Sequence, residues 1–285
     1  MDKSSIKRDA LQYNFLKKIL IRFDYDGMDD SELEQIILDI SLELKKHGYT
    51  SRTVETEREL QFEFNDPESN DYAQLYGKKV REQKVFVFRN ENPQVRLHIS
   101  SSNACIFIEE TKYVDCLVYC NVLWKVMKII SESEEVPFFH FKRFGLRKIN
   151  QCVLRDIKYL NDYFEPAHYH IFSFQNEENI KEKVMQIRDS LEIADYNVNL
   201  IRTLIKGELQ GEEAYQVNYD ADIYLMDSES ITQLIKNKEK IVEMNDWLFA
   251  LYKDAITEKF LDQLIDGTYD ENMIIGVEPN EEDAV

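Results

Sequence analysis

The sequence predicts an α+β fold made of two halves, each a mostly antiparallel sheet packed by helices. Two patterns predict it. Short β-rich segments follow one another across turn signals such as Asn92-Pro93 and Ser102-Asn103, as they do in antiparallel meanders. Each run of such segments is followed by a segment in which apolar residues recur at helical spacing. A helix with one apolar face can cover one face of a sheet.

The first half is expected to run strand, helix, four strands, helix, strand. Ser31 is the expected cap of the first helix, which Gly48 ends, and the second helix is expected over residues 115–130. The expected strands, in chain order, are residues 14–24, 54–64, 84–89, 95–100, 104–109 and 137–150.

The second half is expected to begin as another antiparallel meander and to end in a long helical region. Ser228 or Ser230 is the expected cap of that region, Asn245 is expected to divide it, and Gly267 ends it. The expected strands are residues 168–174, 183–193, 197–209 and 214–226. The predicted parts are an N-terminal α+β domain (1–150), a C-terminal domain of β-meander plus helix (151–267) and an acidic, disordered tail (268–285).

The net charge of −19 argues against direct binding of nucleic acid, because a strongly negative protein repels phosphate groups and anionic membranes. The charge either serves solubility or suits a basic partner. With only 8 glycines and 5 prolines, few Gly-rich phosphate loops can form, and the chain has no Walker or dinucleotide motif. No recognisable nucleophile motif occurs either, so we expect no cofactor and lean against an enzyme.

A cytoplasmic location is expected, because residues 1–9 lack the apolar core of a signal peptide. No apolar run of 18 residues occurs, so no membrane association is expected. The chain has four cysteines and no C-x-x-C pair. Buried free thiols in a reducing compartment are therefore expected, although the spacing of Cys116 and Cys120 would also suit a metal pair on a helix.

Basic residues are densest around residues 142–158. Alternation along a strand directs Phe144 and Leu146 to the core, and Arg143 and Arg147 to the opposite face beside Gly145. Two interpretations stay open. Arg143 and Arg147, with Lys148, could hold an anionic ligand such as a carboxylate or phosphate, or they could pair with the protein's own carboxylates.

His168 and His170 form a second candidate site. Their i,i+2 spacing would direct both imidazoles to one face of a strand, an arrangement that can supply two ligands to a transition metal. The sequence identifies no third ligand. Packing or hydrogen bonding is the alternative role, and it is the more usual one for strand histidines.

Three segments resemble a sporadically distributed, uncharacterised bacterial TIGR family. They are residues 14–24, residues 143–150, which are similar to that family's R-x-G-L-R-Y-I-N signature, and residues 244–249 followed by I-T-E-K at 256–259. This chain has Lys148 where the family has Tyr, and Trp247 or Leu248 where its L-H pair would fall. The resemblance implies no established activity, but the family's patchy occurrence resembles that of genes in phage-defence clusters.

The leading hypothesis is a non-enzymatic cytoplasmic interaction or sensor protein. It would work with a protein partner encoded nearby, in a bacterial phage-defence or toxin–antitoxin-like system. One alternative is a binding module or enzyme for an anionic small molecule or nucleotide. Another is an acidic mimic of nucleic acid that binds a basic protein.

Overall fold

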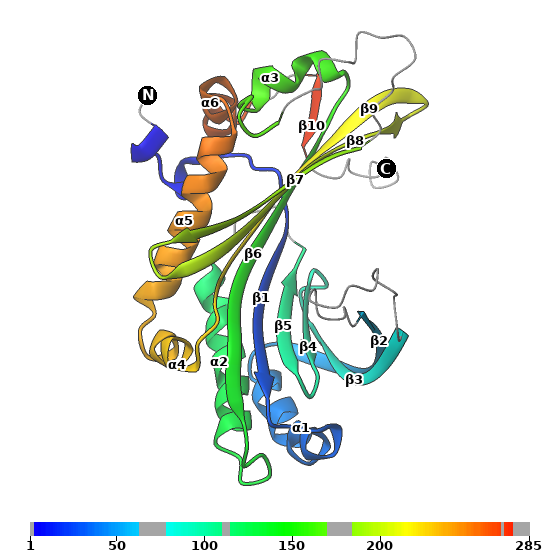
Figure 1. Cartoon of the computed structure of the whole chain (residues 1–285), viewed down its shortest axis with the longest axis vertical. Helices are drawn as coiled ribbons and strands as arrows, with labels where there is room; N and C mark the ends of the chain where they lie inside the picture. The colour runs from blue at the N-terminus through cyan, green and yellow to red at the C-terminus, as the bar shows by residue number, and fades with distance from the viewer. Residues whose placement is uncertain (1–2, 63–77, 110–114, 170–183, 269–270, 276–285) are drawn as a thin grey trace, which may run out of the picture.

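Strands β1 (Leu16–Asp26) and β6 (His140–Leu154) form the centre of the structure and pair antiparallel (Figure 1). The computed structural model describes residues 3–62, 78–109, 115–169, 184–268 and 271–275. Its strands join in one antiparallel sheet of order β2-β3-β4-β5-β1-β6-β9-β8-β7, with β10 pairing with β6. The other strands are β2 (Tyr49–Phe62), β3 (Lys78–Asn90), β4 (Val95–Ile99), β5 (Asn103–Ile108), β7 (Val184–Ile193), β8 (Tyr196–Leu209), β9 (Glu212–Leu225) and β10 (Met273–Ile275).

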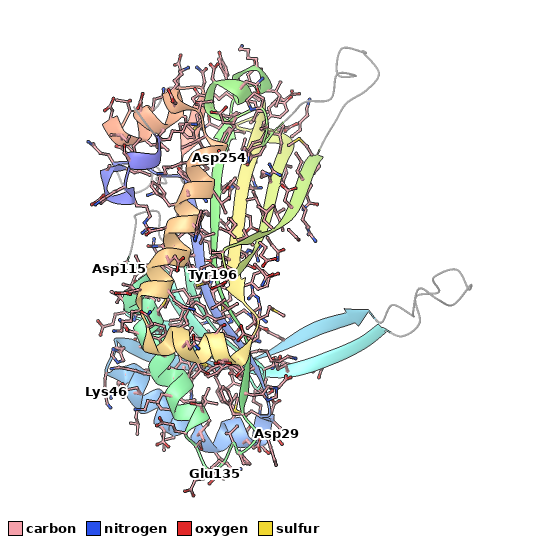
Figure 2. All side chains as sticks on the ribbon, turned by 60° about the vertical axis from the view of Figure 1, so that its left-hand side comes forward. Asp29, Lys46, Asp115, Glu135, Tyr196 and Asp254 are labelled. Atoms are coloured by element: carbon pink, nitrogen blue, oxygen red, sulfur yellow. The ribbon has the colours of Figure 1, made fainter. Side chains whose placement is uncertain are left out.

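Helices lie along one side of this sheet, while the β2–β3 hairpin projects away from it (Figure 2). Alternation in β1 produces the two faces: Ile19, Ile21 and Phe23 are fully buried, whereas Arg22 and Asp24 lie on the opposite face. The helices are α1 (Asp30–Lys45), α2 (Cys116–Ser131), α3 (Leu160–Tyr163), α4 (Ser228–Lys236), α5 (Glu239–Ala255) and α6 (Glu258–Asp266). The predicted α+β fold and the predicted order of elements in the first half are confirmed, and the second half has the predicted antiparallel meander followed by a helical region.

The two halves repeat one topology. In the first, β1 starts the unit and pairs with β5, the last strand before α2, while β4, β3 and β2 extend outward. In the second, β6 starts the unit and pairs with β9, the last strand before α4 and α5, while β8 and β7 extend outward. Because β1 and β6 meet antiparallel at the centre, the arrangement has a pseudo-twofold relation between the halves.

The helix ends follow local capping chemistry. Asp29, not Ser31, caps α1: its carboxylate accepts from the backbone N–H groups of Ser31 and Glu32, and the Glu32 carboxylate accepts from the Asp29 N–H in return. Asn245 does not divide the last helical region, since it is buried inside α5. The region is divided instead at Asn237 and Lys238, between α4 and α5, and at Ile256, which is extended, and Thr257, which caps α6.

Several features lie at or beyond the predicted domain limits. Strand β6 continues past residue 150 to Leu154 and pairs with both β1 and β9. Strand β10 lies within the segment expected as a tail and pairs with residues 152–154 of β6, and residues 276–285 lie outside the described part of the chain. His168 lies in a turn rather than in the expected strand, and residues 170–174 are not described.

None of the helices in the described ranges is long and apolar enough to cross a membrane.

Candidate functional site

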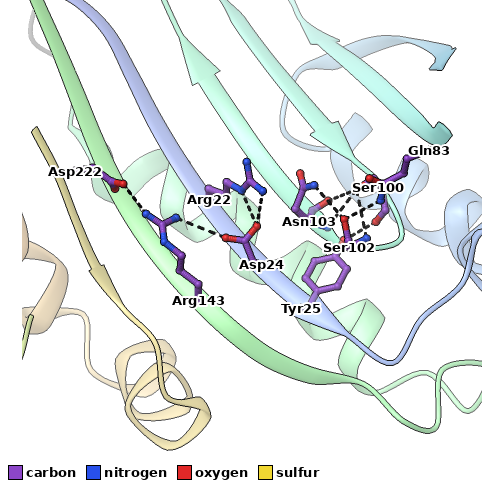
Figure 3. A network of polar contacts seen from close by, with 9 residues as sticks. All are labelled: Arg22, Asp24, Tyr25, Gln83, Ser100, Ser102, Asn103, Arg143 and Asp222. Atoms are coloured by element: carbon purple, nitrogen blue, oxygen red, sulfur yellow. Dashed lines mark hydrogen bonds and ion pairs between the residues drawn. The ribbon is translucent and has the colours of Figure 1, made fainter. Parts of the chain in front are cut away.

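The arginines singled out in the sequence lie on the sheet face opposite the helices. The Arg143 guanidinium donates to Asp222 (Nη2–Oδ2, 2.6 Å) and lies 3.6 Å from Asp24 (Figure 3). Arg147 binds Asp220 through two parallel contacts, Nε–Oδ1 at 2.7 Å and Nη2–Oδ2 at 2.5 Å. Cations and carboxylates therefore alternate across β1, β6 and β9 in an ion ladder of Arg22, Asp24, Arg143, Asp222, Arg147 and Asp220.

Gly145 makes room for this ladder. A Cβ at residue 145 would lie 2.7 Å from the Arg143 Nη1, and the Arg143 guanidinium also lies over the Tyr224 ring, 4.5 Å from its centroid. The space that glycine opens is thus filled by the protein's own arginine. The surrounding groove has a volume of about 340 Å³. Desolvation raises the pKa of Asp222 despite the neighbouring Arg143 and Arg147.

Lys148 lies on the other face, beneath α5, because it alternates with Arg147 along β6. Only 9% of the residue is exposed, and its Nζ donates to the Asn245 Oδ1 at 2.5 Å. Lys148 is one wall residue of a cavity of about 60 Å³ between the sheet and α5. The cavity is lined by Arg8, Leu11, Asn14, Leu16, Lys148, Asn150, Tyr219, Ala221, Leu248, Phe249 and Tyr252.

The three sequence segments that carry the family resemblance converge on this cavity. Asn14 and Leu16 come from the first segment and Lys148 and Asn150 from the second. The third segment contributes Leu248 and Phe249, together with Asn245, the acceptor for Lys148. These segments are far apart in the chain, and the β1–β6 pairing and the position of α5 bring them together.

The charged side chains that are buried around α5 are all positive. The charged side chains that are buried among the described residues are Lys148, Arg202 and Lys253, and no carboxylate is buried with them. Arg202 pairs with Asp189, and Asp246, which pairs with Arg8, acts on Lys148 through its charge; the side chains of these two aspartates are 41% and 63% exposed. Burial accordingly lowers the pKa of Lys148, since desolvation penalises its charged form.

Polar groups without partners lie beside the cavity. Register aligns Asn150, Tyr219 and Arg202 in one row across β6, β9 and β8. The hydroxyls of Tyr219 and Tyr252 and the Nε of Arg202 are buried and have no hydrogen-bond partner in the described ranges. An unpaired buried polar group costs about 1–3 kcal/mol. The two tyrosine hydroxyls and the Arg202 Nε could therefore form further hydrogen bonds.

The N-terminal segment closes the outer side of the cavity. Arg8 donates to the backbone oxygen of Asn245 at 2.5 Å and to Asp246 at 2.7 Å, and its guanidinium lies over the ring of Phe249. The Lys253 ammonium donates to the backbone oxygens of residues 3 and 6. Arg8 and Phe249 also line an open groove of about 550 Å³, so the cavity and the surface meet at these two side chains.

His168 takes part in a hydrogen-bonded chain instead of a metal site. The Arg202 Nη1 donates to its Nδ1 (3.1 Å), so the proton is on Nε2, which donates to Asp254 (3.0 Å); the labelled Asp254 lies on α5 in Figure 2. Arg202 also pairs with Asp189. His170 lies outside the described residues, and the described ranges contain no group of three His, Cys, Asp or Glu that could hold a metal.

All four cysteines are buried and free, which confirms the expectation from the sequence. Burial raises the pKa of each thiol, and that of Cys105 to about 12. Thiols in such surroundings are unreactive. They serve as small apolar core residues here.

Sequence reasoning did not find Arg8, Asn245, Tyr219, Tyr252 or Arg202. Only Asn245 could have been recognised from the sequence. It is a polar residue on a helix face where its neighbours at helical spacing, Ile241 and Leu248, are apolar and buried. The tyrosines follow the ordinary alternation of a strand or helix and give no such signal.

Comparisons with known proteins identify no family. No family model matches the sequence, and no curated protein matches it. One solved structure, S. pombe Pct1 RNA triphosphatase in complex with the Spt5 CTD, aligns over 90% of this chain and 87% of that chain at 8% identity. The TM-score of that alignment is 0.13, so it carries no argument about fold or function.

Proposed function

We propose that this protein is a non-enzymatic sensor that binds a small anion in the cavity beneath α5. One observation carries the proposal: the buried charges of the described chain, Lys148, Arg202 and Lys253, are all positive, although the protein as a whole has a charge of −19. Burying a cation without a buried carboxylate costs free energy. An anion in the cavity would offset that cost for Lys148, the one of the three that lines the cavity.

The geometry supports this site over the ion ladder. Arg143 and Arg147 already hold carboxylates at 2.5–2.7 Å, whereas Lys148 donates to the neutral oxygen of Asn245. An anion would have to displace a carboxylate from the ladder, whereas the Lys148 side chain already lines the wall of the cavity.

Thermal unfolding in the presence of small anions tests the proposal. Stabilisation is expected to follow RT ln(1 + [L]/Kd) when phosphate, acetate, butyrate or AMP is titrated at constant ionic strength. Lys148→Met should abolish the rise in Tm. Lys142→Met is the matched control, because Lys142 lies on the same strand but pairs with Asp26 at the surface. If no anion raises the Tm, or if Lys148→Met responds like wild type, the proposal fails.

A protein partner on the opposite sheet face is a second candidate role, and we propose it as the output of the sensor. The supporting observation is that no helix in the described ranges covers this face, where the side chains of Arg22 and Arg147 remain 47% and 40% exposed. Copurification from the native host with wild type and with Arg147→Glu tests it. Recovery of the same proteins at the same yield with both would count against this face.

A further inference from the structure

A groove on the helical side of the molecule lies between α2, α4 and the start of β6. Asn121, Trp124 and Lys128 line it from α2, Phe141 lines it from β6, and Thr232 lines it from α4. We infer that this α2–α4 groove binds an acidic amphipathic helix of a partner protein. The inference is independent of the proposed function, because no residue that lines the groove also lines the cavity beneath α5 or belongs to the ion ladder.

The floor of the α2–α4 groove is apolar. Trp124 and Met127 belong to the buried face of α2 and are 7% and 1% exposed, and Phe141 is partly buried against the core. Aromatic side chains and methionine are the types enriched at protein–protein interfaces, and methionine adapts to apolar side chains of different shapes. Such a floor favours a bound segment that presents bulky apolar side chains, because burying them against it removes apolar surface from water.

The rim of the α2–α4 groove is basic, although the chain as a whole has a charge of −19. Among the described residues that line the groove, the cations are Lys125, Lys128 and Lys238, and Glu132 is the one carboxylate. Interfaces place complementary charges opposite each other, which orients the partner and disfavours partners of the wrong charge. The rim therefore selects a segment that carries carboxylates.

The partners of the rim lysines neutralise them only in part. The Lys128 ammonium lies 4.0 Å from the Glu132 carboxylate, and both side chains are largely exposed. An exposed pair of this kind contributes about 0–1 kcal/mol. Lys125 pairs with Glu43 at 3.2 Å, but the same carboxylate also pairs with Lys46 at 2.6 Å. Two ammonium groups thus share one carboxylate, and the rim keeps an excess of positive charge for a partner.

The position of the apolar floor favours a helix over a lipid surface. A groove between two helices can receive one face of a third helix, whose apolar side chains at positions i, i+3 or i+4, and i+7 reach the floor while its charged side chains face the rim. A membrane surface is instead bound by an apolar face that projects into the headgroup region. Here Trp124 and Met127 are recessed between α2, α4 and β6.

A dansyl-labelled helical peptide tests this site on the full chain. The peptide has about 15 residues, with Leu or Phe at every third or fourth position and Glu between them. The sequence has two tryptophans, so Trp247→Phe leaves Trp124 to report binding near the groove by energy transfer to the dansyl group. The peptide should bind about tenfold or more tightly than two control peptides, one with Lys in place of Glu and one with Ala in place of Leu and Phe.

Charge-reversal variants locate the binding. Lys128→Glu combined with Lys238→Glu should weaken binding of the acidic peptide about tenfold or more. Lys158→Glu combined with Lys259→Glu is the matched control, because it changes the net charge equally at exposed side chains outside the groove, and it should leave binding unchanged. Thr232→Phe, which fills the groove without changing its charge, should abolish binding.

The outcomes separate this inference from its alternatives. If the acidic peptide does not bind, or if the Lys peptide binds as tightly, the inference is overturned. If both double variants bind the peptide like the parent protein, the peptide binds elsewhere and the groove assignment fails. If phosphatidylserine vesicles change the Trp124 emission and the peptide does not, the groove is a lipid contact. None of these results bears on the anion site, which the Lys148→Met variant tests.

Discussion

Replacing Gly145 by alanine tests the ion ladder at its most closely packed point. The new Cβ would lie 2.7–2.9 Å from the Nη1, Nη2 and Cζ atoms of Arg143, closer than carbon approaches such atoms. The backbone cannot give way easily, because Gly145 is paired on both sides, with Arg22 of β1 and Tyr224 of β9. The Arg143 side chain must therefore move, and its contacts with Asp222 and Tyr224 are lost.

The contacts at stake give the expected loss of stability. The charge-assisted bond from Arg143 to Asp222, at 2.6 Å, is worth about 1.5–3 kcal/mol, and the contact over the Tyr224 ring about 0.5–1 kcal/mol. Alanine recovers about 0.5–1 kcal/mol because it loses less backbone entropy than glycine in a strand. The net expectation is a free energy of unfolding lowered by about 2 kcal/mol.

Urea unfolding followed by circular dichroism and tryptophan fluorescence measures this change. Gly207→Ala is the matched control: Gly207 also lies in a strand, β8, but its Cβ would meet nothing within 4 Å, so the variant should gain about 0.5–1 kcal/mol. In an Arg143→Ala background, where the clash is absent, Gly145→Ala should gain about 0.5–1 kcal/mol, as Gly207→Ala does. The reasoning is refuted if Gly145→Ala is as stable as Gly207→Ala, or if its cost is the same with and without Arg143.

Three further predictions concern other parts of the molecule. Burial lowers the folded-state pKa of Lys148, so between that pKa and about 10.5 the unfolded chain binds more protons than the folded chain. As the pH rises through this window, the free energy of unfolding of the wild type should therefore increase relative to that of Lys148→Met, by at most about 1.4 kcal/mol per pH unit. Urea unfolding of both proteins at several pH values measures this difference. Asp29→Ala should lower the free energy of unfolding by about 1 kcal/mol, and Ser31→Ala by clearly less, because Asp29 is the α1 cap; equal losses would contradict this assignment. Labelling with a thiol reagent should reach all four cysteines in denaturant and none within minutes in the native protein, and rapid native labelling would show that the thiols are accessible.

The order of elements could be predicted because it depends on local patterns. Period-two alternation marks β1 and β6, and apolar residues at helical spacing mark α1 and α2. The same alternation predicts that Arg147 and Lys148 lie on opposite faces of β6. The strand order could not be predicted, because the pairing of β1 with β6 joins residues more than a hundred positions apart and leaves no local signal.

The partners in the candidate site were hidden for a different reason. The chain has 54 Asp and Glu residues, so nothing in the sequence distinguishes Asp220 and Asp222 as the carboxylates that Arg147 and Arg143 bind. The cavity depends on the tertiary position of α5, which brings Asn245 to Lys148, and on the N-terminal segment that brings Arg8. Such contacts follow from packing and not from spacing along the chain.

The repeated topology provides an internal comparison for the buried charges. Helix α2 ends the first unit, and its buried residues are all apolar or cysteine, from Cys116 to Ile130. Helix α5, in the corresponding place of the second unit, buries Asn245, Tyr252 and Lys253 and covers Lys148. Among the described residues, the first unit thus buries no charged side chain. Buried charges cost free energy; in the second unit Arg202 pairs with Asp189, Lys253 donates to the backbone oxygens of residues 3 and 6, and the anion proposed for the cavity would be a further partner of Lys148.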